Sequence, residues 1–80
     1  MKKEEIIEKI NEIFRDLFDD DSLVVNENTT SSDIEDWDSL VHIHLLIDVE
    51  NTFGIKFSMN EAASLKNVGM MVDIIYEKLQ

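Results

Sequence analysis

DWDSLVHIHLLIDVENTFGIKF, residues 36–57, is the segment in which the helical pattern of the chain is most complete. Asp38 precedes the pattern and can cap a helix N-terminus, and Gly54 follows it as a natural C-cap. We therefore predict a helix that begins just after Asp38 and stops at Gly54. Its apolar residues recur at intervals of three and four, the spacing of one helix face: Leu40, Ile43, Leu46, Val49 and Phe53, widened by Leu45 and Ile47.

The same spacing occurs on both sides of this segment. One apolar stripe predicts a first helix from about residue 3 to 18: Ile6, Ile10, Ile13, Phe14 and Leu17. A second predicts a last helix that Asn67 can cap: Val68, Met71, Val72, Ile75 and Leu79. Between them, Ser58 and Glu61 have the spacing of a capping box, so a short helix is expected to start at Met59.

Residues 19–37, DDDSLVVNENTTSSDIEDW, lose the helical period and gather side chains that compete with helical backbone bonding. We expect a long loop anchored by Leu23, Val25 and Ile34, because so long a loop in so short a chain is usually functional or partly held. The chain has no proline, two glycines and no sustained strand alternation. The predicted class is therefore all-α: a small four-helix bundle with three long helices, one short helix and a long first loop.

Length and composition limit the possible classes further. Eighty residues are expected to form a single domain over 1–80, because a chain this short cannot divide its buried surface between two cores. The absence of cysteine excludes disulfides and thiolate metal sites. No apolar run approaches the roughly 20 residues of a membrane span, and the start of the chain mixes acids into its apolar residues. We therefore expect a cytoplasmic protein.

The formal net charge of -11 is unevenly distributed. No lysine or arginine occurs between Asp16 and Ile55, whereas that window holds eleven acids and the rest of the chain has seven acids against seven bases. Such a field repels phosphate backbones and anionic lipid, so nucleic acid and membrane are not expected partners and basic protein surfaces are favoured. A merely solubilising acidic surface remains the alternative.

The acidic loop does not match a dedicated calcium site. An EF-hand frame that begins at Asp19 places Leu23 at its fifth position, and one that begins at Asn26 places Trp37 at its twelfth, where oxygen ligands are needed. No dedicated metal site is predicted here, and diffuse binding of divalent ions by the acidic loop is left as an alternative.

The two histidines do not form a metal-binding pair either. His42 and His44 are two residues apart, so on a helix they point in nearly opposite directions. His44 lies four residues before Asp48 and is expected to pair with it.

Ser39 admits two interpretations. A hydrolase nucleophile would need a base and an oxyanion site, and no G-x-S-x-G elbow surrounds it, so the chain is not expected to be an enzyme. Ser39 could belong merely to a capped helix start. Alternatively, its hydroxyl is exposed near the positive end of the helix dipole, where an attached phosphodiester would be stabilised.

The whole arrangement resembles the acyl carrier protein family over nearly all 80 residues. An amphipathic first helix and a long acidic loop lead to "DSL", followed by an apolar pattern and an E-x-x-F ending at Glu50–Phe53, then a short and a final helix. By this resemblance Ser39 matches the serine that receives 4'-phosphopantetheine from coenzyme A, flanked by Asp38 and Leu40. The resemblance implies that the arm's thiol carries an acyl group as a thioester, and that other enzymes do the catalysis.

The resemblance also implies an acyl cavity among the last three helices and a docking face on the second. The candidates for the cavity are apolar: Ile43, Leu46, Phe53, Ala62, Leu65 and Met71. The candidates for the docking face recur at helical spacing after Ser39: His44, Ile47, Glu50 and Asn51, together with Leu40. The implied partners are a phosphopantetheinyl transferase and acyl-processing enzymes with basic surfaces, and the protein is expected to be monomeric.

The "WDS" form of the signature also resembles carriers outside primary fatty acid synthesis, so a fatty acid pathway and a specialised polyketide, aminoacyl or acyl-sugar pathway both fit. The rival hypothesis from another class is an unmodified acidic helical module for protein–protein interaction, in which "DSL" is only a helix cap.

Overall fold

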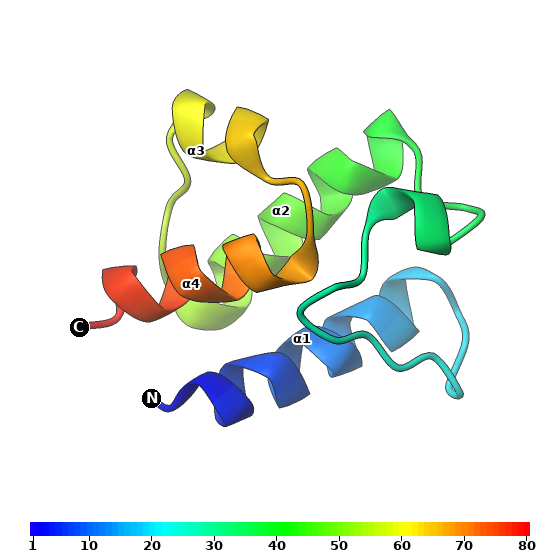
Figure 1. Ribbon diagram of the computed structural model, residues 1–80, viewed down its shortest axis with the longest axis horizontal. Coiled ribbons are helices and arrows are strands. Elements are labelled where there is room, and N and C mark those ends of the chain that lie inside the picture. Colours follow the sequence, from blue (N-terminus) through cyan, green and yellow to red (C-terminus); the bar gives the residue numbers. More distant parts are fainter.

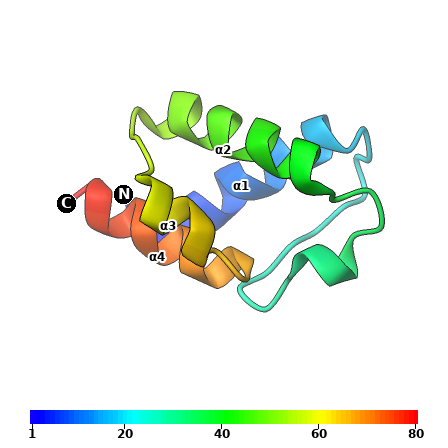
Figure 2. The same cartoon turned by 90° about the horizontal axis from the view of Figure 1, so that it is seen from above.

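The three long helices, residues 3–17, 39–53 and 68–78, surround one apolar core, and the first of them contacts the other two (Figures 1 and 2). The computed structural model describes residues 1–80 and is entirely helical: α1 (Lys3–Leu17), a 3-10 turn η1 (Ser31–Asp33), α2 (Ser39–Phe53), α3 (Met59–Ser64) and α4 (Val68–Lys78). The predicted fold class is confirmed, and the helix bounds agree with the predictions to within one residue. The turn η1 was not predicted, because three residues are too few to show a helical period.

The apolar stripes of α1 and α4 form most of the core. Ile6, Ile10 and Phe14 of α1 are fully buried, as the first stripe predicts. From α4 come Val68, Met71, Val72 and Ile75, all of which are buried. Both termini lie at one end of the bundle, and η1 with the long loop lies at the other (Figures 1 and 2).

The buried face of α2 differs from the predicted stripe. Leu45, Val49 and Phe53 are buried, whereas Leu40 is 66% exposed and Ile43 is 55% exposed. Apolar side chains surround most of α2, so spacing alone does not show which row of residues faces α1. The row that packs is i, i+4, i+8 from Leu45, and the first turn of the helix keeps its apolar residues at the surface.

The ends of α2 match the sequence prediction. The Asp38 side chain accepts a hydrogen bond from the Val41 N–H at 2.9 Å, which satisfies one of the free donors of the first turn. Gly54 ends the helix in the left-handed conformation, with φ of 67°.

The long loop is anchored at the expected apolar residues. Val25 is 2% exposed, and Leu23 and Ile34 are partly buried against the core. A buried polar residue of α1 adds a link that the sequence does not indicate: the Asn11 amide bonds to both backbone groups of Val25. The loop is therefore fixed at its middle as well as at its ends.

The N-terminus of α4 is built on this loop. The Val68 N–H donates to the Thr29 carbonyl and the Gly69 N–H to the Glu27 carbonyl, each at 2.9 Å. A Cβ at position 69 would lie only 2.9 Å from the Glu27 oxygen, so the close approach requires glycine.

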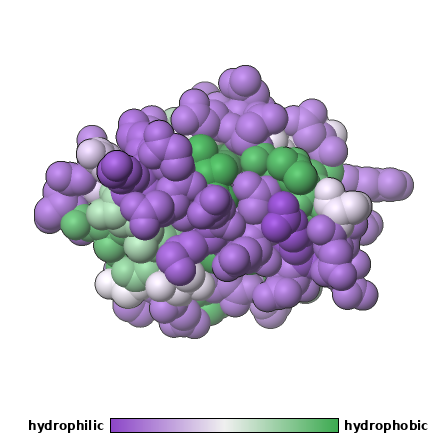
Figure 3. All heavy atoms as spheres, turned by 90° about the horizontal axis from the view of Figure 1, so that it is seen from below, coloured by the Kyte–Doolittle hydropathy of each residue, from purple (hydrophilic) through white to green (hydrophobic).

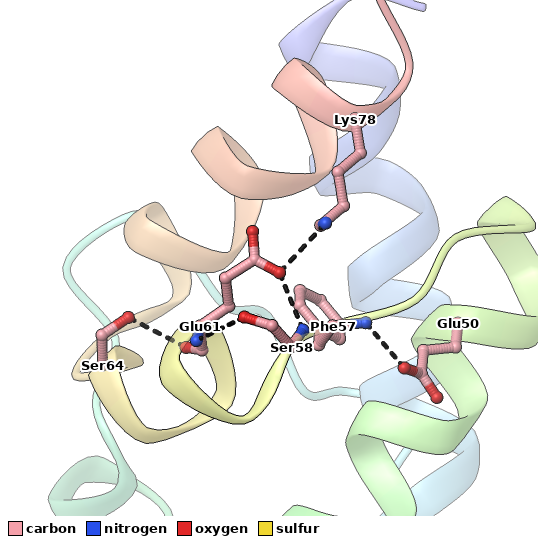
Figure 4. A network of polar contacts seen from close by, with 6 residues as sticks. All are labelled: Glu50, Phe57, Ser58, Glu61, Ser64 and Lys78. Atoms are coloured by element: carbon pink, nitrogen blue, oxygen red, sulfur yellow. Dashed lines mark hydrogen bonds and ion pairs between the residues drawn. The ribbon is translucent and has the colours of Figure 1, made fainter.

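Polar contacts tie α3 to its neighbours (Figure 4). The Ser58 Oγ accepts from the Glu61 N–H at 3.1 Å, and the Ser58 N–H donates to the Glu61 carboxylate at 2.8 Å, which completes the predicted capping box. Lys78 of α4 lies 3.0 Å from the same carboxylate. The Glu50 carboxylate of α2 accepts from the Phe57 N–H at 2.8 Å, so the α2–α3 connection is held at both ends.

On the face seen from below in Figure 3, hydrophilic side chains cover most of the surface, and apolar atoms show between them as a strip. None of the helices combines the length and the apolar character that a membrane crossing requires.

Candidate functional site

Ser39 occupies the first helical position of α2, directly after the capping residue Asp38. Its side chain is exposed, as is that of Leu40 beside it. Because the first N–H groups of a helix lack intrahelical partners, an oxygen-rich anionic group attached at this position would meet free donors and the positive end of the helix dipole. Ser39 is thus reachable from solvent and placed where a phosphate is favoured.

A cleft of about 570 Å³ opens beside Ser39, between the start of α2 and the start of α4. We call it the Ser39 cleft. Three of its apolar lining residues come from separate elements: Ile43 from α2, Leu65 after α3 and Met71 from α4. The full lining is Ser31, Trp37, Asp38, Ser39, His42, Ile43, Leu65, Lys66, Asn67 and Met71.

Only part of the predicted acyl-pocket set lines this cleft. Ile43, Leu65 and Met71 do so, whereas Leu46, Phe53 and Ala62 do not. Phe53 is buried in the core, and Leu46 is partly buried against it. These two lie farther along α2, where the helix packs on the bundle instead of bordering open space.

Trp37 and His42 form a stacked pair in the wall of the cleft. Their ring centroids are 5.8 Å apart with an interplanar angle of 22°, and the Trp37 Nε1–H donates to His42 Nδ1 at 3.1 Å. On its other side Trp37 meets Phe14 edge-on at 5.3 Å between centroids. An aromatic chain therefore connects α1, the end of the long loop and the first turns of α2.

Burial lowers the pKa of His42 below its ordinary value of 6.5. The neutral imidazole is the form that accepts a hydrogen bond at Nδ1, so the lowered pKa and the bond from Trp37 agree. At neutral pH the ring then carries its one proton on Nε2.

The sequence did not indicate the contribution of Trp37 and His42 to the cleft wall. The available signal was the spacing of a lone tryptophan just before the helix cap and a histidine one turn into the helix. Lys66, Asn67 and Ser31 were also missed, because they come from connections whose course the helical pattern does not determine.

The predicted docking residues of α2 are not equivalent. His44 and Asn51 are exposed, and Ile47 is 48% exposed, so these three are accessible to a partner. Glu50 is half-buried and bonded to the Phe57 N–H, which gives it a role inside the molecule as well. The expected pair between His44 and Asp48 does not form: no hydrogen bond or ion pair joins them, and both side chains are exposed to water, where such pairs gain little.

The structure brings no group of three histidine or acidic side chains close enough to hold a metal ion.

Comparison with known proteins gives consistent matches along the whole chain. This chain is 33% identical over 75 residues to an acyl carrier protein of Lactobacillus acidophilus, and the match covers 94% of each chain. It is 37% identical over 78 residues to an acyl carrier protein of Rubrobacter xylanophilus, with 96% of this chain and 95% of that protein covered. No family model matches the chain.

Among solved structures, the solution NMR structure of holo acyl carrier protein from Geobacter metallireducens superimposes with a TM-score of 0.85 and 42% sequence identity. The match covers 91% of this chain and 84% of that one. The agreement therefore extends over most of the fold.

Proposed function

The chain belongs to the acyl carrier protein family, and from that premise we propose that it carries acyl groups on 4'-phosphopantetheine attached to Ser39. By its family membership we infer that the chain acts as a carrier and that other enzymes do the catalysis. The observation that carries the proposal is the position of Ser39: an exposed hydroxyl at the start of α2 and at the edge of a cleft.

The residues around Ser39 fit the arm. The Ser39 hydroxyl would be esterified by its phosphate, and the first-turn donors of α2 would stabilise the negative charge. Asp38 uses its side chain to cap the helix, so it fixes the backbone that presents this hydroxyl. When bound, the arm would supply a terminal thiol, on which the acyl group is held as a thioester.

The Ser39 cleft is the place on this chain where an attached acyl group can leave water. Ile43, Leu65 and Met71 offer it an apolar wall. Leu46, Phe53 and Ala62 would be reached only if the bundle opened beyond this cleft. Sequestration of the cargo would slow its hydrolysis until a partner enzyme accepts it.

Partner enzymes would dock on the exposed side of α2 near the attachment point. Leu40 and Ile47 place apolar surface there, and the window from residue 16 to 55 contributes acids without a basic residue. Such a surface is complementary to partners with basic residues, including a phosphopantetheinyl transferase and acyl-processing enzymes. We propose a cytoplasmic monomer of a single domain that serves a fatty acid pathway or a specialised polyketide, aminoacyl or acyl-sugar pathway.

Incubation with coenzyme A and a phosphopantetheinyl transferase tests the proposal by intact mass. We expect one added phosphopantetheine on the wild type, none on Ser39→Ala, and normal addition to Ser32→Ala, which removes another exposed serine of the same region. Unmodified wild type with several transferases would instead support the acidic interaction module, and modification of Ser39→Ala would place the arm elsewhere.

A further inference from the structure

The Ser39 cleft carries hydrogen-bond donors that have no partner in the protein. Asp38 uses a carboxylate oxygen to cap α2, and Asn67 uses its side-chain oxygen to cap α4 at the Met70 N–H, 2.8 Å away. The Lys66 ammonium is in no ion pair, and the Asn67 amide nitrogen has no partner in the protein. The Lys66 and Asn67 nitrogens are therefore free to bind a cargo, as is the hydroxyl of Ser31, and that of Ser39 is free until the arm is attached.

His42 adds the most defined of these donors. Its Nδ1 accepts from the Trp37 indole, so in the neutral ring Nε2 carries the proton. Nε2 has no partner in the protein, and since no buried polar side-chain atom is left unsatisfied, this nitrogen is open to solvent. The stacked indole fixes both the ring plane and the tautomer, so the Nε2–H of this cleft-lining residue is a pre-oriented donor.

A purely aliphatic chain fits such a wall poorly. Its contact with Ile43, Leu65 and Met71 would be favourable, but covering Nε2–H without an acceptor removes a hydrogen bond to water and returns none. The lining also holds one carboxylate, Asp38, and one ammonium, Lys66, so a charged cargo gains no net attraction. The complementary cargo has an apolar body and a neutral oxygen.

We propose that His42 is a specificity-determining residue of the cleft, and that its Nε2–H selects acyl groups bearing a neutral acceptor oxygen, such as a 3-oxo or 3-hydroxy group, over saturated ones. The proposal rests on the carrier function proposed above and names the class of cargo that this cleft holds best. Trp37 is a positioning residue in this arrangement, because it acts only through the His42 ring.

Protection of the thioester from exchange with excess 2-mercaptoethanol tests this selection, because a thiol cleaves both thioesters without consuming the 3-oxo group. Hexanoyl and 3-oxohexanoyl groups are loaded through the arm, and loading is verified by intact mass. The protection of each cargo is the cleavage rate of the same thioester on free pantetheine divided by its cleavage rate on the protein. We expect the 3-oxo cargo to be protected about three- to tenfold more than the hexanoyl cargo, the factor that corresponds to one net hydrogen bond. The 15N shift of His42 Nε2 should move with the 3-oxo cargo and stay unchanged with hexanoyl.

Three variants separate the donor from the fold. His42→Phe should abolish the preference, His42→Gln should restore part of it through the amide donor, and Thr52→Phe, at an exposed α2 position outside the cleft, should leave it intact. The proposal would be overturned by equal protection of both cargoes on the wild type. It would also be overturned if folded His42→Phe kept the preference for the 3-oxo cargo, or if folded His42→Gln lost that preference completely. A protein that loads at Ser39 without preference refutes only the role of His42, whereas one that never loads refutes the carrier function too.

Discussion

The buried Asn11 side chain holds both backbone groups of Val25: its Oδ1 accepts from the Val25 N–H at 2.7 Å, and its Nδ2 donates to the Val25 carbonyl at 3.3 Å. Nδ2 also donates to the Ile7 carbonyl at 3.0 Å. The Asn11 side chain thus supplies the hydrogen bonds that the buried backbone of Val25 would otherwise lack. Without it, two buried peptide groups would be left without partners.

Replacing Asn11 should therefore destabilise the protein more than a surface asparagine does. We expect Asn11→Ala to lower the free energy of unfolding by on the order of 2 kcal/mol, because buried donors and acceptors lose their partner. Urea denaturation followed by circular dichroism measures the change. Asn28→Ala, in an exposed part of the same loop, is the control and should change stability little. Equal midpoints for the two variants would show that water replaces the lost bonds.

The charge of Glu61 should contribute stability only above acidic pH. The Ser58 N–H bond and then Lys78 hold the pKa of this carboxyl below its ordinary value of 4.5. The contribution is therefore complete above pH 4.5 and is lost as pH falls through the lower, folded-state pKa. At pH 6 wild type should melt at a higher temperature than Glu61→Gln, which keeps a capping-box acceptor, and this difference should shrink as the pH is lowered below 4.5. If the melting temperatures of wild type and Glu61→Gln differed by the same amount at every pH, the difference would come from the shape of the side chain and not from its charge.

Protonation of His42 should destabilise the fold at mildly acidic pH. Its folded-state pKa lies below 6.5, so as pH falls below that value the unfolded chain binds the proton first and the free energy of unfolding decreases. Between pH 7 and pH 5 the melting temperature of wild type should fall more than that of His42→Phe. The difference should be a fraction of the roughly 4–8 °C that corresponds to 1 kcal/mol in a domain of this size. His44→Gln, at the exposed histidine, should behave as wild type, and a wild-type slope in His42→Phe would assign the effect elsewhere.

The exposed face of α2 should control the rate of Ser39 modification. Truncation of a central apolar contact typically costs more than 1 kcal/mol, so Ile47→Ala should raise the KM of a transferase about five- to tenfold at any salt concentration. Glu50→Gln keeps an acceptor for Phe57 and removes the charge, so its effect should be largest at low salt.

Met59→Ala is the matched control, because Met59 is 89% exposed on α3 and lies outside this face. Wild-type rates for folded Ile47→Ala and Glu50→Gln would exclude this surface as the docking site of the enzyme tested.

The elements that local spacing and caps determine could be predicted from the sequence. Asp38, Gly54, Ser58 and Asn67 each act through neighbours within a few residues, and the structure places each at the expected helix end. The exposure of Ser39 also follows from its position in the first turn.

Features that depend on distant parts of the chain could not be predicted. The Asn11–Val25 bonds join residues fourteen apart, and nothing in the polarity of Asn11 shows that it points inward. The Ser39 cleft likewise depends on where Lys66 and Met71 meet the start of α2, which is a matter of tertiary packing. For α2, whose apolar residues surround the helix, the pattern did not decide which side would be buried, and Leu40 and Ile43 share their helical spacing with buried residues although both are exposed.

Because of the backbone hydrogen bonds at the start of α4, amide hydrogen exchange there measures the opening of the long loop. The N–H groups of Val68 and Gly69 donate to carbonyls of the long loop, at Thr29 and Glu27, and not to their own helix. When the loop detaches from the bundle, these two hydrogens become free to exchange with deuterium while α4 itself stays wound. Their exchange rates therefore give the free energy of opening of the long loop around Glu27 and Thr29, although the two amides themselves belong to α4. The amides of Ile10 and Phe14, in the buried stripe of α1, give the free energy of opening of the whole fold.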